Sequence, residues 1–252
     1  VMRVIAAINT LAYGVETYWD NRYSQDTSTF DWYQWYAGVA PLINMYIPKS
    51  SKILMVGCGN AAISEDMVFD GYQDIVNIDI SAVVIEAMRE KYKDIHQLQY
   101  QRMDVQEMKA FKDGQFDSVL DKGLLDSLTC GTSAPCSVST MLQEVHRVLK
   151  PGGVYLLITL GEPRLRLPHL KAENCLWEVL FHVISKPGSR RTDESTSKLL
   201  TVQVLLNDDL TFGPLFKMED PDLHYVYVCI KEGSTTKVQE PLGGLGKPSS
   251  VT

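Results

Sequence analysis

Short apolar runs that alternate with helical segments constrain the fold of this chain most. Five of these runs have the length of buried strands, and the first four end at or near a glycine or an acidic residue, which favours strands over buried helices. Strands that are separated by helices form a parallel sheet with helices on both faces, and right-handed crossovers limit its topology. We therefore predict an α/β, doubly wound, mostly parallel sheet. Its first five strands are residues 52–56, 74–78, 97–102, 116–120 and 154–159.

The pattern changes after the fifth strand. Residues 177–184 and 224–230 are both strand-like, and no full-length helix is evident between them. An antiparallel pair at one edge of the sheet explains this arrangement, whereas the apolar run at 199–206 stays unassigned. Ser81 is suited to cap the helix that follows the second strand. The helices predicted between the strands are residues 62–71, 81–91 and 140–149.

Composition and charge exclude several classes of protein. The 252 residues suit one large domain, and a formal net charge of −7 does not suit binding to nucleic acid, which needs clustered Lys and Arg. The acidity favours a partner with a basic surface. No apolar run reaches the roughly 18 residues that span a membrane. Five cysteines without a C-x-x-C pair argue against a disulfide framework or a metal site and favour a reducing, cytoplasmic location.

Composition also sets the expected domain boundaries. Residues 1–17 are weakly apolar and have no convincing signal-peptide cleavage site, so we expect them to be disordered or foreign to the domain. Residues 233–252 are rich in Gly, Ser, Pro and Thr, and we expect a disordered tail there. The predicted domain therefore spans residues 18–232.

Four strand ends carry residues suited to a ligand, because open parallel sheets bind ligands beyond the carboxyl ends of their strands. Gly57 and Gly59 follow the first strand, where glycines let the backbone turn sharply and approach a ligand. Residues 57–62 also match the dinucleotide pattern G-x-G-x-x-A, and a tight turn without a ligand is the alternative. Asp79 follows the second strand and suits the two hydroxyls of an adenosine ribose, which several cofactors share.

The third and fourth strand ends add further polar residues. Asp104 can accept the amino group of an adenine while Met103 or Val105 packs on the ring, and an ordinary turn is an equal alternative. Asp121 and Lys122 place opposite charges at the fourth strand end, unless they form an exposed surface pair. Taken together, these strand ends and the Leu-Lys-Pro-Gly-Gly turn before the fifth strand resemble class I S-adenosylmethionine-dependent methyltransferases.

Five segments carry a more specific resemblance. They are Tyr-Trp-Asp-Asn-Arg-Tyr at 18–23, Phe-Asp-Trp-Tyr at 30–33, Val-Gly-Cys-Gly-Asn at 56–60, Val-Asn-Ile-Asp-Ile-Ser at 76–81 and Asp-Lys-Gly-Leu-Leu-Asp at 121–126. These segments resemble the eukaryotic family of methyltransferase-like proteins that includes the elongation factor 1-alpha lysine methyltransferases. The W-D-x-x-Y and D-K-G-x-x-D motifs are specific to that group, and the resemblance covers residues 18–231.

The resemblance implies a Rossmann-like methyltransferase fold with seven strands and an antiparallel last hairpin. It implies S-adenosyl-L-methionine as the methyl donor, S-adenosyl-L-homocysteine as the product and an N-terminal helix that closes over the donor. Aromatic faces attract cations such as a sulfonium, although the aromatics at 32–36 have helical spacing and packing on the sheet is their alternative role. The implied donor contacts are Trp19, Tyr23, Trp32, Gly57, Gly59, Asp79, Ile80, Asp104, Val105 and Lys122.

The same resemblance implies methyl transfer to a lysine of a protein substrate, with a translation factor as the expected partner. Asp121 and Asp126 are the nearest candidates in the sequence for a catalytic base. The family often has Thr or Trp where this chain has Leu124, a change that alters the approach of the acceptor, and residues 162–222 are expected to carry acceptor specificity. A small-molecule O- or N-methyltransferase and a donor-binding protein without turnover are the alternatives. A monomer is expected.

Overall fold

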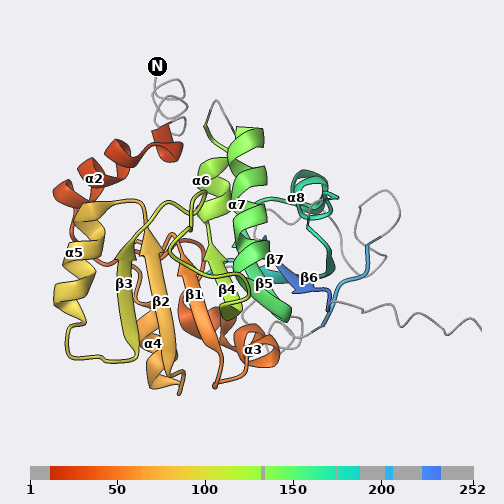
Figure 1. The fold of residues 1–252 in the computed structure, drawn as a ribbon, viewed down its shortest axis with the longest axis horizontal. Helices are drawn as coiled ribbons and strands as arrows, with labels where there is room; N and C mark the ends of the chain where they lie inside the picture. The colour runs from red at the N-terminus through yellow and green to blue at the C-terminus, as the bar shows by residue number, and fades with distance from the viewer. Residues whose placement is uncertain (1–11, 132–133, 174, 188–201, 207–222, 234–252) are drawn as a thin grey trace, which may run out of the picture.

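The computed structural model describes residues 12–131, 134–173, 175–187, 202–206 and 223–233. In this part of the chain, seven strands form one sheet in the order β3-β2-β1-β4-β5-β7-β6 (Figure 1). Strands β1 to β5 are parallel, and β7 is antiparallel to both β5 and β6. The predicted doubly wound sheet with an antiparallel last hairpin is confirmed. The strands are β1 Lys52–Val56, β2 Asp74–Asp79, β3 Leu98–Arg102, β4 Phe116–Lys122, β5 Leu149–Thr159, β6 Trp177–Ser185 and β7 Leu223–Lys231.

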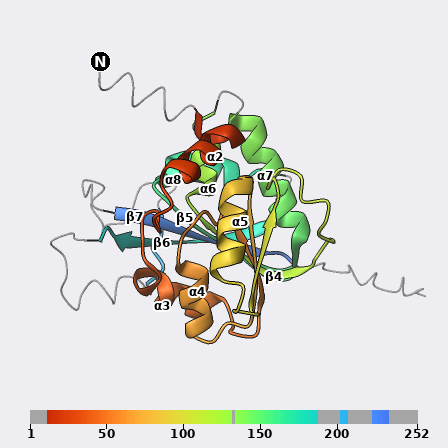
Figure 2. The ribbon, with the colours of Figure 1, turned by 90° about the vertical axis from the view of Figure 1, so that its left-hand side faces the viewer.

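Helices cover both faces of the sheet (Figure 2). The helices on one face are α3 Tyr36–Tyr46, α4 Ile63–Phe69 and α5 Ala82–Lys91. The helices on the other face are α6 Leu124–Leu128, α7 Ala134–Val148 and α8 Pro163–Leu170. Strands that are covered on both sides need apolar residues at successive positions rather than at alternate ones. Strand β1 meets this need, because its four residues from Ile53 to Val56 are all buried.

Local signals explain the cap of α5 and the first turns of α7 and α8. The Ser81 hydroxyl accepts a 3.3 Å hydrogen bond from the Val84 N–H, as expected of a cap for α5. Helix α7 begins several residues earlier than predicted, because Pro135 is tolerated in a first turn, where its missing N–H would have no helical partner. Helix α8 was not predicted, and it too has a proline, Pro163, in its first turn.

The domain begins earlier than predicted. A short 3-10 helix, η1 (Ala12–Gly14), precedes α2 (Glu16–Gln25), so the predicted boundary at residue 18 is too late. The Trp19 indole N–H donates a 2.7 Å hydrogen bond to the carbonyl of Tyr13 and ties the two elements together. Helix α2 lies beside α5 at the end of the sheet (Figure 1). Residues 1–11 and nearly all of the predicted tail, residues 234–252, lie outside the described residues.

Two other expectations concern segments that are described only in part. Of the unassigned apolar run, residues 202–206 are described, and the Val204 N–H donates a 2.8 Å hydrogen bond to the carbonyl of Phe181 in β6. Residues 162–222, expected to carry acceptor specificity, include large stretches outside the described residues. Among the helices that are described, none has the length and apolar character to span a membrane.

Candidate functional site

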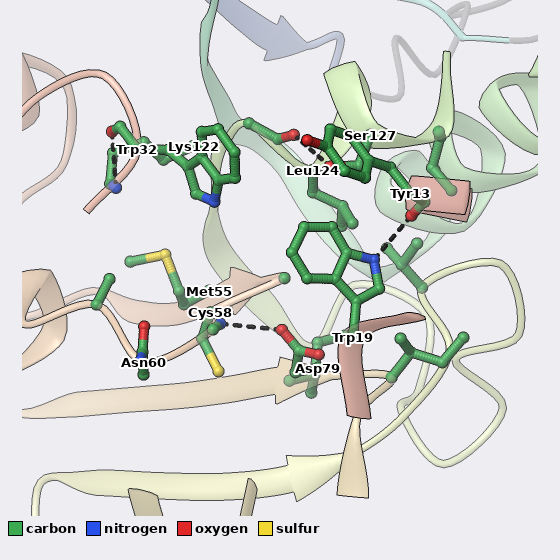
Figure 3. A pocket seen from close by; sticks show the side chains of 18 of the residues that line it. Tyr13, Trp19, Trp32, Met55, Cys58, Asn60, Asp79, Lys122, Leu124 and Ser127 are labelled. Carbon is green, nitrogen blue, oxygen red and sulfur yellow. Dashed lines mark hydrogen bonds between the residues drawn. The ribbon is translucent and has the colours of Figure 1, made fainter. Parts of the chain in front are cut away.

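A cavity lies beyond the carboxyl ends of β1, β2, β3 and β4, where the winding of the sheet reverses between β1 and β4. The space between its lining residues is about 990 Å³ when the open mouth is included. Every residue that the sequence predicted as a donor contact lines it. These residues are Trp19, Tyr23, Trp32, Gly57, Gly59, Asp79, Ile80, Asp104, Val105 and Lys122. Figure 3 labels four of them, Trp19, Trp32, Asp79 and Lys122.

The loop after β1 forms one wall of the cavity and depends on two glycines. Gly57 and Gly59 have φ angles of 61° and 52°, in the left-handed region that residues with a Cβ rarely adopt. A Cβ on Gly59 would lie 2.7 Å from the Tyr23 hydroxyl, and one on Gly57 would lie 2.8 Å from the Cβ of Leu124. The turn therefore requires glycine at both positions, and bare backbone faces the neighbouring side chains.

Asp79 holds this loop and keeps capacity for a ligand. Its Oδ2 accepts a 2.9 Å hydrogen bond from the Gly59 N–H, and its Oδ1 accepts one of 3.0 Å from the Ser81 N–H. Burial raises the pKa of the Asp79 carboxyl, and these N–H groups oppose that shift. A carboxylate has about four acceptor positions, so Asp79 can still accept bonds from two hydroxyls such as those of a ribose.

The wall beyond β2 and β3 combines apolar side chains with a second carboxylate. Ile80, Met103 and Val105 line the cavity here. Asp104 lies among them, and its Oδ1 accepts a 2.8 Å hydrogen bond from the Gln106 N–H, which fixes the turn after β3. The combination fits an adenine, whose ring packs on apolar groups and whose amino group donates to an acid.

Aromatic side chains of the N-terminal segment form a roof over the cavity. Trp19 stacks on Tyr23 with ring centroids 6.0 Å apart, and Phe30 meets the edge of Trp32 at 5.0 Å. Tyr13 lies 5.5 Å from Trp19 and joins the roof. The sequence missed Tyr13 and Phe30 as lining residues, the first because its segment had been left outside the domain. Since aromatic faces attract cations, the roof suits a sulfonium.

The ammonium of Lys122 is held by the protein itself. Its Nζ lies 2.9 Å from the Asp31 Oδ1. It also donates a 3.0 Å hydrogen bond to the carbonyl of Trp32, and both Lys122 and Trp32 are labelled in Figure 3. The side chains of this ion pair are 5% and 2% exposed. Asp121 is buried as well, so the exposed surface pair of Asp121 and Lys122 considered from the sequence is wrong. Asp31 was not predicted as a site residue, because nothing in its local sequence indicates a partner far along the chain.

Neither candidate base lines the cavity. The carboxylate of Asp121 accepts hydrogen bonds from the N–H groups of Leu124 and Leu125, at 2.8 and 3.2 Å, and holds the first turn of α6. Asp126 accepts a 2.7 Å hydrogen bond from the Tyr33 hydroxyl and forms an ion pair with Arg166. These contacts give both carboxylates a structural role, and the geometry does not support either as the base.

The buried carboxyl of Asp121 should make stability fall as the pH rises toward neutrality. Burial, with the charge of Asp126, raises the pKa of Asp121 to about 7 from an ordinary 3.8. Between these values the folded protein keeps a proton that the unfolded chain releases, so a rise in pH favours unfolding. We expect the free energy of unfolding, measured with urea between about pH 4 and pH 7, to fall by up to about 1.4 kcal/mol per pH unit. The fall should shrink in Asp121→Asn, and an equal fall in both proteins would contradict this role of the carboxyl.

Known proteins match this chain over the same region. A family described as a methyltransferase domain matches residues 54–157. An EEF1A lysine methyltransferase 4 of Bos taurus is 34% identical over 172 residues, which cover 64% of this chain and 67% of that protein. An eEF1A lysine and N-terminal methyltransferase of Homo sapiens is 37% identical over 180 residues, which cover 69% of this chain and 25% of that longer protein.

Solved structures share the fold at low sequence identity. A protein of echinomycin biosynthesis, described by the conversion of a disulfide bond into a thioacetal group, has a TM-score of 0.58 at 16% identity and covers 89% of this chain and 96% of its own. A methyltransferase of Thermotoga maritima has a TM-score of 0.51 at 11% identity, with coverage of 79% and 90%. From these matches and the cavity at the strand ends, the chain belongs to the family of S-adenosylmethionine-dependent methyltransferases that includes the eEF1A lysine methyltransferases.

Proposed function

We propose that the cavity binds S-adenosylmethionine and that the chain transfers its methyl group to the side-chain amine of a lysine in a protein, with elongation factor 1A as the substrate. One observation supports the donor site above all others: four strand ends and the aromatic roof line the same cavity. The names of the relatives support the acceptor, because those proteins are eEF1A lysine methyltransferases.

A different part of the cavity lining suits each chemical group of the donor. Asp79 would bind the ribose hydroxyls, and Val105 would pack on the adenine while Asp104 accepts its amino group. The donor carboxylate needs a cation, and Arg22 lines the cavity with its guanidinium 5.3 Å from the centre of the Phe30 ring. Lys122 suits this role less, because Asp31 and a carbonyl already hold its ammonium.

Methyl transfer depends on the alignment of donor and acceptor more than on proton transfer. When bound, the donor supplies a methyl group already activated by its positive sulfur. The neutral lysine nitrogen forms a bond to the methyl carbon while the bond from carbon to sulfur breaks, and the sulfur keeps the electron pair. The protein holds the two reactants in line. The aromatic roof attracts the cationic donor more strongly than the neutral thioether product, which favours exchange of product for donor.

The net charge of the chain supports a protein lysine as the acceptor, and its free cysteines support a cytoplasmic location. The net charge of −7 favours a substrate with a lysine-rich surface. All five cysteines are free, and Cys58, Cys175 and Cys229 are buried, which is typical of a protein of the reducing cytoplasm, where we place it. Among the described residues, no three His, Cys, Asp or Glu side chains are grouped to hold a metal ion.

A methyl-transfer assay tests the proposal. Purified chain, elongation factor 1A and donor with a labelled methyl group should yield label on a lysine, identified by mass spectrometry. Asp79→Ala should weaken donor binding by roughly tenfold or more, the effect of losing hydrogen bonds to a charged group. The control is Asp74→Ala at the opposite end of the same strand, which should bind the donor normally.

Three outcomes would contradict the proposal in different ways. Donor binding without label in any protein would favour a binding protein without turnover. Label in small molecules of a cell extract, with none in elongation factor 1A, would favour a small-molecule methyltransferase. Equal donor affinity in Asp79→Ala and the parent would remove Asp79 from the donor site.

A further inference from the structure

A strap formed by residues 28–34 crosses the carboxyl end of the sheet and carries part of the aromatic roof. It begins at the loop after β1, where Asn60 binds it twice. The Asn60 side-chain amide donates a 2.5 Å hydrogen bond to the carbonyl of Ser28, and its Oδ1 accepts one of 3.3 Å from the Phe30 N–H. Phe30 and Trp32 of the strap line the cavity, whereas Asp31 between them does not.

Asp31 and Lys122 fix the middle of the strap. The Asp31 Oδ2 accepts a 3.2 Å hydrogen bond from the Ala62 N–H, at the start of α4, while its Oδ1 lies 2.9 Å from the Lys122 Nζ. The same ammonium donates to the carbonyl of Trp32. One carboxylate therefore joins the loop after β1 to the end of β4, and one lysine holds two successive strap residues.

The far end of the strap is fixed by its next two residues. Tyr33 has a φ of 67°, a strained conformation for a residue with a side chain, and its hydroxyl donates to Asp126. The Gln34 amide donates a 2.6 Å hydrogen bond to the carbonyl of Ser185 in β6. A Cβ on Gly123 would lie 3.2 Å from the Tyr33 ring, so this end of the strap lies tight against the turn after β4. The strain at Tyr33 persists because contacts on both sides hold it.

The ion pair between Asp31 and Lys122 is buried, so each charge depends on the other for its stability. A buried lysine without a partner loses its charge readily, and burial indeed lowers the pKa of Lys122 while Asp31 opposes that shift. Removing one partner leaves the other charge buried alone. Lys122 lines the cavity, but its ammonium lies 2.9 Å from Asp31 and donates to the carbonyl of Trp32, so its charge is directed at the strap.

We propose that Lys122 and Asp31 are positioning residues that set Phe30 and Trp32 over the methyl donor, and that Lys122 acts through the strap rather than by binding the donor. The role of Lys122 differs from the direct donor contact expected from its sequence motif. The inference rests on the proposed donor site for its effect on affinity, but the fixing of the strap can be measured without any ligand.

The test compares Asp31→Ala, Lys122→Met and the double variant. Each change breaks the ion pair between Asp31 and Lys122, so all three should weaken S-adenosylmethionine binding, measured by calorimetry, by roughly tenfold or more. Amide hydrogen exchange of residues 28–34 should speed up in all three, with the donor absent. Asp74→Ala, which removes an acid in a partly exposed ion pair with Lys52, is the matched control and should change neither measurement.

The outcomes separate this inference from the proposed function. A loss of affinity in Lys122→Met with unchanged hydrogen exchange of the strap would show direct contact between the lysine and the donor, and would overturn the inference. Unchanged exchange in the strap of every variant would overturn it as well. If the parent protein fails to bind the donor, the proposed function fails, while faster exchange in the strap still supports the link. The double variant leaves no unpaired buried charge and serves where a single variant does not fold.

Discussion

Replacing Asp126 with alanine should lower the free energy of unfolding by about 3–5 kcal/mol, the range for breaking one side of a buried ion pair. The guanidinium of Arg166 is 9% exposed and would lose its carboxylate. The Tyr33 hydroxyl and the Thr159 hydroxyl, which donate to Asp126 at 2.7 and 2.5 Å, would lose their acceptor as well. Urea denaturation near neutral pH measures the loss.

Two controls separate the buried charge from simple loss of a side chain. Asp126→Ala combined with Arg166→Met leaves no unpaired charge and should recover part of the loss. Glu86→Ala removes an acid whose ion pair with Arg89 is largely exposed, and should change stability by less than about 1 kcal/mol. If Asp126→Ala itself cost no more than Glu86→Ala, the cluster around Asp126 would have no structural role.

Gly57→Ala should destabilise the protein and abolish donor binding. At a φ of 61° an alanine is strained by about 1–2 kcal/mol. Its Cβ would also lie 2.8 Å from the Cβ of Leu124, an overlap of the kind that costs about 1–3 kcal/mol. Relief requires the loop after β1 or the start of α6 to move, and both line the cavity. Thermal unfolding and calorimetry with S-adenosylmethionine measure the two effects.

Gly152→Ala is the matched control for this prediction. Gly152 has a φ of 75°, and a Cβ there would have no neighbour within 4 Å. Gly152→Ala should therefore lose only the stability that backbone strain costs, and it should bind the donor with normal affinity. If Gly57→Ala and Gly152→Ala were equally stable and both bound the donor, the overlap between the new Cβ and Leu124 would have no effect on the cavity. That result would contradict the prediction.

The sequence predicts the strand ends well because their signals are local. Gly57, Gly59 and Asp79 follow apolar runs whose length and composition indicate buried strands, and parallel strands bring their carboxyl ends to one edge. The cap of α5 is equally local, since Ser81 and Val84 are three residues apart. Features of this kind need no knowledge of distant contacts.

The strap is different, because its contacts join residues far apart in the chain. The helical spacing of the aromatics from Trp32 to Tyr36 left packing on the sheet as their alternative role, yet Tyr33 is left-handed and α3 begins only at Tyr36. Asp31 forms an ion pair with Lys122 at the end of β4. Asp126 forms an ion pair with Arg166 of α8, a helix that was not predicted. A carboxylate near a strand end was therefore read as a base when its partners make it structural.

The order of the last two strands has a consequence for synthesis of the chain. In the described part of the chain, β5 has β7 as its outer neighbour, and β6 joins the sheet through β7. The β5 edge, complete at Thr159, thus stays open until the ribosome has passed Leu223, a wait on the order of seconds at roughly 5–20 residues per second. Open edges pair with other chains. A nascent chain in the interval between β5 and β7 is therefore exposed to aggregation through this edge, and a chaperone that covers the edge would protect it.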